Sequence, residues 1–210
     1  MIFADRYEAG KKLAKKLARY AGRKDIIILA IPRGALQIGA PIARALRCPL
    51  DIFVSKKIPA PGNEEFAIGA VSQEGVVDVD DDTIREYGEE YIQKQVKRLK
   101  GMVKEKYTRY TGKKQPPSLT RKVVILCDDG IATGHTMKAA ARAIRKLGPA
   151  RIIIAAPVAP PQAVRELEEM ADEVIVLSVE ENFFAIGNFY ASFPQVEDEE
   201  AIRILREARK

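Results

Sequence analysis

Two adjacent carboxylates stand between a short apolar run and a loop rich in glycine and threonine. The run covers residues 123–127, the carboxylates are Asp128 and Asp129, and the loop ends at Thr136. In an open parallel sheet, ligands bind beyond the carboxyl ends of the strands, where a helix N-terminus offers unpaired N–H groups to a phosphate. These residues therefore predict a phosphate cradle at the start of a helix, with two acids beside it.

The residue types in this loop suit a sugar phosphate. Glycine lets the backbone approach a ligand closely, and threonine hydroxyls add hydrogen-bond donors. Carboxylates do not bind phosphate directly, but they accept hydrogen bonds from sugar hydroxyls or lie around a hydrated Mg²⁺. The pattern thus indicates a phosphorylated sugar bound with a metal. The candidate phosphate-binding residues are Gly130, Ile131, Ala132, Thr133, Gly134, His135 and Thr136.

Alternative roles for this stretch are less favoured by the neighbouring residues. A Walker-type loop needs a lysine after its last glycine, whereas His135 follows Gly134, and no GxGxxG follows any apolar run. Asp128 and Asp129 could cap the following helix, although one cap needs only one aspartate. His135 is the only histidine, and no serine lies near it in the sequence, so a general-base role is disfavoured.

Short apolar runs and helical periodicities alternate along most of the chain. The runs have the length and β-branched content of buried strands and cover residues 26–31, 50–55, 123–127, 151–157 and 173–178. Helical spacing is found at residues 5–21, 35–46, 135–147, 161–171 and 197–209. Repeated strand–helix units of this kind form mostly parallel sheets that are covered on both faces. We therefore predict an α/β fold with a mostly parallel twisted sheet and helices on both faces.

This alternation is interrupted by an insertion at residues 57–121. Two prolines and a Gly-Asn pair predict a loop over residues 56–63. A hairpin of strands 66–71 and 76–79 is expected next, followed by one long helix over residues 83–111. The whole chain, residues 1–210, is then a single domain that carries an insertion.

The strongest local charge lies in residues 94–122, which hold eleven lysines and arginines against one acid, Glu105. A solvated helix face is the simplest explanation. Subunit contact and attraction of a polyphosphate substrate remain open. Nucleic-acid binding is less favoured, because Tyr107 and Tyr110 are the only aromatic residues in the segment and it matches no known binding motif.

The composition is that of an ordinary globular protein. Of the 210 residues, 47% are hydrophobic and 30% charged, and the net charge of +6 permits a phosphate-bearing partner. Cys48 and Cys127 are far apart and form no CxxC, which argues against a disulfide scaffold and a zinc knuckle. No apolar run approaches the roughly 18 residues of a membrane span. We expect a cytoplasmic protein with no membrane partner.

Residues 123–136 resemble the phosphoribosyl pyrophosphate (PRPP) signature of the type I phosphoribosyltransferases, with an apolar run, two acids and a Thr-Gly-x-Thr ending. Residues 31–34 (Ile-Pro-Arg-Gly) are similar to the family's pyrophosphate loop, in which a strained or cis peptide is implied. Residues 60–64 and 67–71 further resemble a bacterial and archaeal branch whose acceptor is undefined. The resemblance covers about residues 25–180.

The resemblance implies roles for individual residues. Asp128 and Asp129 would be the catalytic acids, which hold the ribose hydroxyls and through them a Mg²⁺ that has no direct protein ligand. The insertion would supply a mobile lid, and residues 180–210 would form a hood over the acceptor. The implied pyrophosphate-binding residues are Arg33, Gly34, Lys56 and Lys57. The implied acceptor-binding residues are Phe183, Phe184 and Tyr190.

The function implied by the resemblance is transfer of a phosphoribosyl group from PRPP to a nitrogenous acceptor such as a nucleobase, with release of pyrophosphate. Ala132 stands where the 6-oxopurine enzymes carry an aspartate, so hypoxanthine or guanine salvage is disfavoured. A homodimer is possible, since dimers are common in this family. The second hypothesis is a non-catalytic PRPP-sensing regulator that binds nucleic acid through residues 94–122. A phosphorylase or hydrolase of another ribose phosphate is the third.

Overall fold

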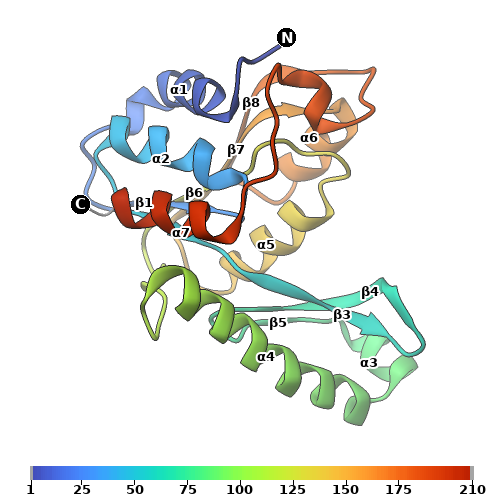
Figure 1. The fold of residues 1–210 in the computed structure, drawn as a ribbon. Helices are drawn as coiled ribbons and strands as arrows, with labels where there is room; N and C mark the ends of the chain where they lie inside the picture. The colour runs from blue at the N-terminus through green and yellow to red at the C-terminus, as the bar shows by residue number, and fades with distance from the viewer. Residues whose placement is uncertain (1, 209–210) are drawn as a thin grey trace. The chain divides into compact units, whose positions relative to one another are not determined.

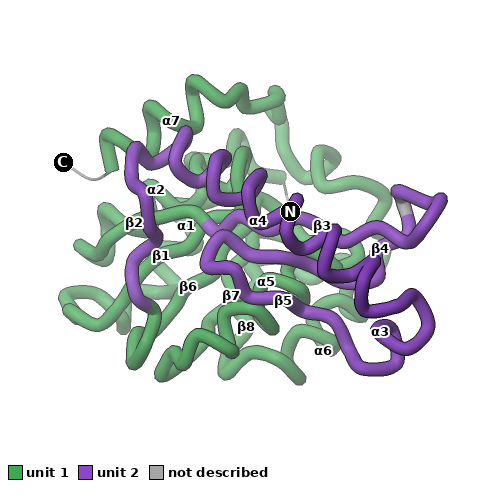
Figure 2. Tube along the Cα trace, turned by 90° about the horizontal axis from the view of Figure 1, so that it is seen from below, with its two compact units in different colours: residues 1–52, 119–210 green, residues 53–118 purple. Residues whose placement is uncertain are grey.

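The computed structural model describes residues 2–208, apart from the side chain of Glu65. The chain forms two units, which Figure 2 shows in different colours. We call residues 1–52 together with 119–210 the sheet unit, and residues 53–118 the inserted unit. The inserted unit covers nearly the same residues as the insertion expected at 57–121.

The sheet unit is built on five parallel strands in the order β2-β1-β6-β7-β8. The strands are β1 (Ile26–Ala30), β2 (Leu50–Ile52), β6 (Val123–Cys127), β7 (Arg151–Ala159) and β8 (Glu173–Val179). Every residue of β1 and β6 is buried, as strands covered on both faces require. The predicted α/β fold with a mostly parallel sheet is confirmed.

Helices cover both faces of this sheet (Figure 1). They are α1 (Arg6–Lys16), α2 (Ala35–Leu46), α5 (His135–Arg145), α6 (Pro161–Glu168) and α7 (Asp198–Glu207). β2 lies on one side of β1 in the sheet, whereas β7 and β8 follow on the opposite side, beyond β6. Because such crossovers are right-handed, α2 lies on one face, with α1 and α7, and α5 and α6 lie on the other. The order reverses between β1 and β6, which is where open α/β sheets bind ligands.

The inserted unit holds an antiparallel sheet of β3 (Ser55–Ala60), β4 (Asn63–Ser72) and β5 (Val77–Asp78). Two helices follow, α3 (Asp81–Tyr87) and α4 (Glu89–Thr111). α4 packs against β3 and β4. Its Leu99 and Val103 are buried, as are Ile58 and Val71 of the sheet. The unit therefore has an apolar core of its own.

Two expectations for the insertion are wrong. Residues 56–60 form a strand rather than a loop, because β3 lies at the edge of its sheet and pairs irregularly at Pro59, where a missing N–H is tolerated. The long helix expected over residues 83–111 is divided at Gly88, whose φ of +84° lies in the left-handed region that favours glycine.

Candidate functional site

A cavity of about 160 Å³ follows the end of β6. Its walls are Asp128, residues 130–137 and Ile186. α5 begins within this stretch, at His135, so the unpaired N–H groups of its first turn belong to the cavity wall. Gly134 precedes the helix with a φ of +73°, a conformation that residues with a side chain rarely adopt. All seven candidate phosphate-binding residues thus line one cavity, which we call the cradle.

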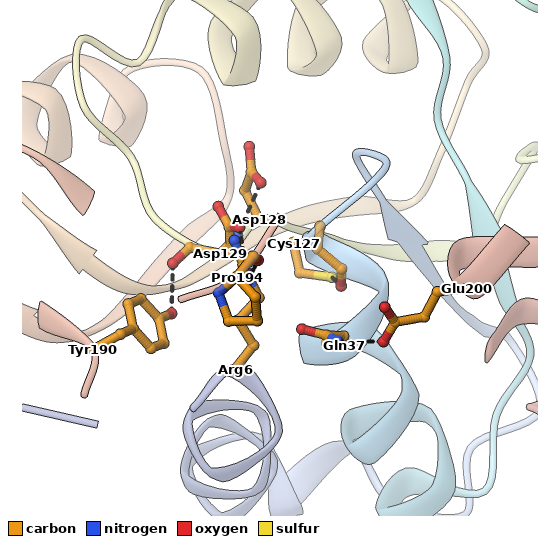
Figure 3. Close-up of polar contacts among 9 residues, drawn as sticks. Arg6, Gln37, Cys127, Asp128, Asp129, Tyr190, Pro194 and Glu200 are labelled. Carbon is orange, nitrogen blue, oxygen red and sulfur yellow. Dashed lines mark hydrogen bonds and ion pairs between the residues drawn. The ribbon is translucent and has the colours of Figure 1, made fainter. Parts of the chain in front are cut away.

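The two adjacent acids have different surroundings (Figure 3). Asp128 lines the cradle, and its carboxylate accepts the N–H of Asp129 at 2.8 Å. Asp129 turns instead toward Arg6 of α1, whose Nε lies 2.6 Å from Oδ2. Burial, together with the negative charge of Asp129, raises the pKa of the Asp128 carboxyl well above its usual range. Of the two acids expected to hold the ribose, the structure brings Asp128 to the cradle wall.

The loop after β1 reaches the same acid pair. Its Pro32–Arg33 peptide bond is cis. Gly34 packs so closely on Asp129 that a Cβ at residue 34 would lie 2.1 Å from Oδ2, so a larger residue does not fit there. The guanidinium of Arg33 lies 3.5 Å from two carboxylates at the N-terminus of α7. Gly34 therefore adjoins the acid pair, while Arg33 reaches toward α7.

Lys56 and Lys57 belong to β3 of the inserted unit. They line a second cavity, of about 330 Å³, within that unit. The other residues of its wall are Pro59, Glu64, Arg98, Leu99 and Met102. The wall therefore contains three cationic side chains, one acidic side chain and three apolar ones.

The aromatic residues of the tail differ in their exposure. Phe184 is 89% exposed, and Phe183 stacks on Phe189 with ring centroids 5.2 Å apart. Tyr190 is only 7% exposed, and its hydroxyl donates to the main-chain oxygen of Asp129 at 2.6 Å. Burial is the main reason that the pKa of this phenol lies above its usual range. Phe184 is free to meet a ligand, whereas Tyr190, expected to bind the acceptor, is engaged in holding the tail.

Two residues of the site were missed by the sequence analysis. Ile186 closes one side of the cradle, and a Cβ at Gly130 would lie 2.5 Å from its Cγ2. The only signal in the sequence was the glycine itself, which leaves room for a neighbouring side chain. Arg6 is the partner of Asp129, but nothing in the sequence connects two residues that lie 123 positions apart.

His135 and Cys127 were the remaining candidates for a catalytic side chain. His135 is exposed, and its Nδ1 lies 3.2 Å from the hydroxyl of Thr133. Cys127 is fully buried, and burial raises the pKa of its thiol, which suits a core residue rather than a nucleophile. Neither position favours a catalytic role for the side chain.

Comparison with known proteins identifies the family. A model of the phosphoribosyl transferase domain matches residues 2–192. The chain belongs to the phosphoribosyltransferase family. The resemblance that residues 123–136 suggested is therefore confirmed at the level of the family.

The relatives of this chain differ in how much of their length it covers. A Mycobacterium tuberculosis H37Rv protein, provisionally named phosphoribosyl transferase Rv0571c, is 34% identical over 214 residues, which cover all of this chain and 47% of that protein. The chain thus spans about half the length of the curated relatives it matches. TT1426 from Thermus thermophilus is 37% identical, with a TM-score of 0.86 and coverage of 99% of both chains. AQ2163 from Aquifex aeolicus shares the fold, with a TM-score of 0.52 at 15% identity over 83% of this chain and 74% of that one.

Residues 2–208 contain no cluster of three or more histidine, cysteine, aspartate or glutamate side chains that could hold a metal ion. Over the same residues, no helix has the length and apolar character of a membrane span.

Proposed function

We propose that this protein transfers the phosphoribosyl group of PRPP to a nitrogenous acceptor such as a nucleobase and releases pyrophosphate. The observation that carries the proposal is the cradle, which joins a helix N-terminus, two threonines and Asp128 in one cavity at the switch point of the sheet. The amides of residues 132–136 and the hydroxyls of Thr133 and Thr136 bind the 5′-phosphate. Asp128 accepts a hydrogen bond from a ribose hydroxyl.

The reaction breaks a glycosidic C–O bond through a transition state with oxocarbenium character. Negative charge then develops on the departing pyrophosphate, and fixed donors placed beside it lower the barrier. We assign this task to the amide of Gly34 and to Arg33. A Mg²⁺ ion bound with PRPP would supply charge neutralisation at the pyrophosphate.

The tail is proposed to bind the acceptor. Phe184 projects a ring that is 89% exposed, and base–aromatic stacking is worth about 1–3 kcal/mol per base. Ala132, also exposed, offers no side-chain group to a 6-oxopurine ring. An acceptor without a 6-oxo group is therefore favoured.

The test is turnover of labelled PRPP with Mg²⁺ and a panel of nucleobases. We expect wild-type protein to release pyrophosphate only when a suitable base is present. Thr133→Val, which removes one exposed hydroxyl from the cradle, is expected to raise KM for PRPP about tenfold. Thr108→Val in α4 is the matched control and is expected to behave as wild type. Absence of both turnover and PRPP binding in the wild type would refute the proposal.

A second candidate function is supported by the exposed face of α4. Lys94, Lys97 and Lys104 lie on one side of this helix, since they are spaced by three and seven residues, and all three are exposed. Within the described residues, none of the three forms an ion pair. A PRPP-sensing regulator could use this face to bind nucleic acid. It would bind PRPP without turnover, and its affinity for DNA or RNA would fall linearly with the logarithm of salt concentration.

A further inference from the structure

Arg6, the first residue of α1, is a buried cation with three contacts. It is 5% exposed, and its Nε lies 2.6 Å from Asp129 Oδ2. Its Nη1 donates to the main-chain oxygen of Pro194 at 2.8 Å, and its guanidinium carbon lies 3.6 Å from the ring centroid of Phe193. The planar fork of arginine can serve an acid, a carbonyl and a ring face at once, which a lysine cannot do. One side chain therefore joins the second acid to the tail.

This ion pair determines where the Asp129 carboxylate points. A buried cation needs a partner, and Asp129 is the carboxylate that Arg6 contacts (Figure 3). The pair also lies against the pyrophosphate loop, since a Cβ at Gly34 would be 2.9 Å from Arg6 Nε as well as 2.1 Å from Asp129. Asp128, whose carboxylate Arg6 does not contact directly, is left at the wall of the cradle. The two acids of the signature thus divide into one that is fixed by Arg6 and one that faces the ligand.

The same contacts fasten the tail that closes the cradle. Main-chain hydrogen bonds join Phe3 to Phe189 at 2.8 Å and Ala191 to Phe3 at 2.7 Å. The Tyr190 hydroxyl adds the bond to the main chain of Asp129. Ile186 lies a few residues upstream, on the wall of the cradle. Loss of the Arg6 contacts would therefore loosen both the acid pair and the segment that carries Ile186.

We propose that Arg6 is a positioning residue of the phosphoribosyl site, which acts by fixing Asp129 and the tail so that Asp128 alone presents its carboxylate to the sugar. The inference rests on the proposed function. It adds that a residue of the first helix, outside the PRPP signature and outside the pyrophosphate loop, sets the geometry of the site.

A double-mutant cycle tests this inference. Arg6→Gln and Asp129→Asn are made singly and together, and the Kd and KM for PRPP with Mg²⁺ are measured at a temperature where thermal unfolding shows each variant to be folded. We expect each single variant to raise both constants about tenfold and the double variant to be no worse than the poorer single one, because residues that act as a unit are not additive. If the increases in Kd and KM of the two single variants multiply in the double variant, the proposal that Arg6 acts through Asp129 is overturned.

Arg6→Lys keeps the test usable if Arg6→Gln does not fold. A lysine ammonium can pair with Asp129 but cannot also reach the Pro194 carbonyl. We therefore expect the KM for PRPP of Arg6→Lys to lie between those of wild type and Arg6→Gln. If Arg6→Gln does not fold, the expected KM of Arg6→Lys is about threefold above that of wild type. A merely structural role would lower the folded fraction, and hence kcat per total protein, with KM unchanged. That outcome, or a folded variant with wild-type constants, would overturn the inference.

The control is Lys11→Gln, which removes an exposed cation from the same helix and is expected to leave Kd and KM unchanged. The two proposals fail in different ways. Wild-type protein that neither binds nor turns over PRPP refutes the proposed function, and the Arg6 inference falls with it. If wild-type protein binds PRPP and the Arg6 variants have the same Kd and KM as wild type, the Arg6 inference alone is refuted.

Discussion

Ile186 packs on Gly130 so closely that a Cβ at residue 130 would lie 2.5 Å from Ile186 Cγ2 and 2.9 Å from Cγ1. Both residues line the cradle. The tail can therefore close over the loop only while residue 130 has no side chain. In the structure, this glycine makes room for a neighbouring side chain.

Gly130→Ala is expected to weaken both the fold and the site. An added methyl group in a packed region typically costs about 1–3 kcal/mol, and here it would also displace Ile186 from the cradle wall. We expect a lower unfolding temperature and a weaker PRPP affinity by calorimetry. Ile186→Ala in the same chain removes Cγ1 and Cγ2, the two carbons nearest the added methyl group, and should recover part of both losses. No recovery would mean that this contact does not limit the site.

Asp128→Asn is expected to stabilise the protein at neutral pH while it abolishes most PRPP affinity. Because the pKa of Asp128 is raised in the folded state, the protonated carboxyl is favoured there, and stability is lost as the pH rises from the unfolded value of about 3.9 through the folded value. An amide avoids this loss and still accepts the Asp129 N–H. The unfolding temperatures should coincide below about pH 3.9 and diverge above it. A variant less stable than wild type at pH 7.5 would contradict this account.

Asp129→Asn is expected to destabilise the protein. Removal of one partner leaves the buried Arg6 cation without its counter-ion, which typically costs about 3–5 kcal/mol. Denaturant unfolding measures the change directly. Asp25→Asn is the matched control, because its ion pair with Arg23 is exposed, and exposed pairs contribute only about 0–1 kcal/mol. Equal losses in the two variants would show that the Arg6 pair is not a buried one in solution.

Tyr190→Phe and Phe184→Ala separate the two roles of the tail. Tyr190→Phe removes the donor to a buried carbonyl, so we expect a loss of about 1–2 kcal/mol in stability and an unchanged KM for the acceptor. Phe184→Ala removes an exposed ring, so we expect stability within about 0.5 kcal/mol of wild type and an acceptor KM raised about tenfold. The reverse pattern would place the acceptor against Tyr190.

The sequence was most informative where a local pattern determines structure. The apolar runs at 26–31 and 123–127 predict strands because a parallel sheet buries both faces of each strand. The loop from Gly130 to Thr136 predicts a phosphate site because its residue types and the following helix lie in one continuous stretch. Both features can be inferred without any knowledge of distant contacts.

What the sequence could not supply depends on tertiary pairing. Residues 56–60 contain a proline and suggested a loop, but they become a strand through pairing with β4. The role of Asp129 depends on Arg6, which lies 123 positions earlier in the chain and is brought to it by the fold. Tyr190 and Phe184 are both aromatic residues of one tail, and only their burial distinguishes a structural ring from an available one.

The bridge between Phe3 and Tyr190 joins the first residues of the sheet unit to the tail segment whose Ile186 lines the cradle. During synthesis, a nascent chain that has emerged only as far as β8 would have the phosphate loop but lack Ile186 and the segment that pairs with Phe3. On the proposed function, capture of PRPP on the ribosome is therefore expected to begin only after the residues around 190 have emerged.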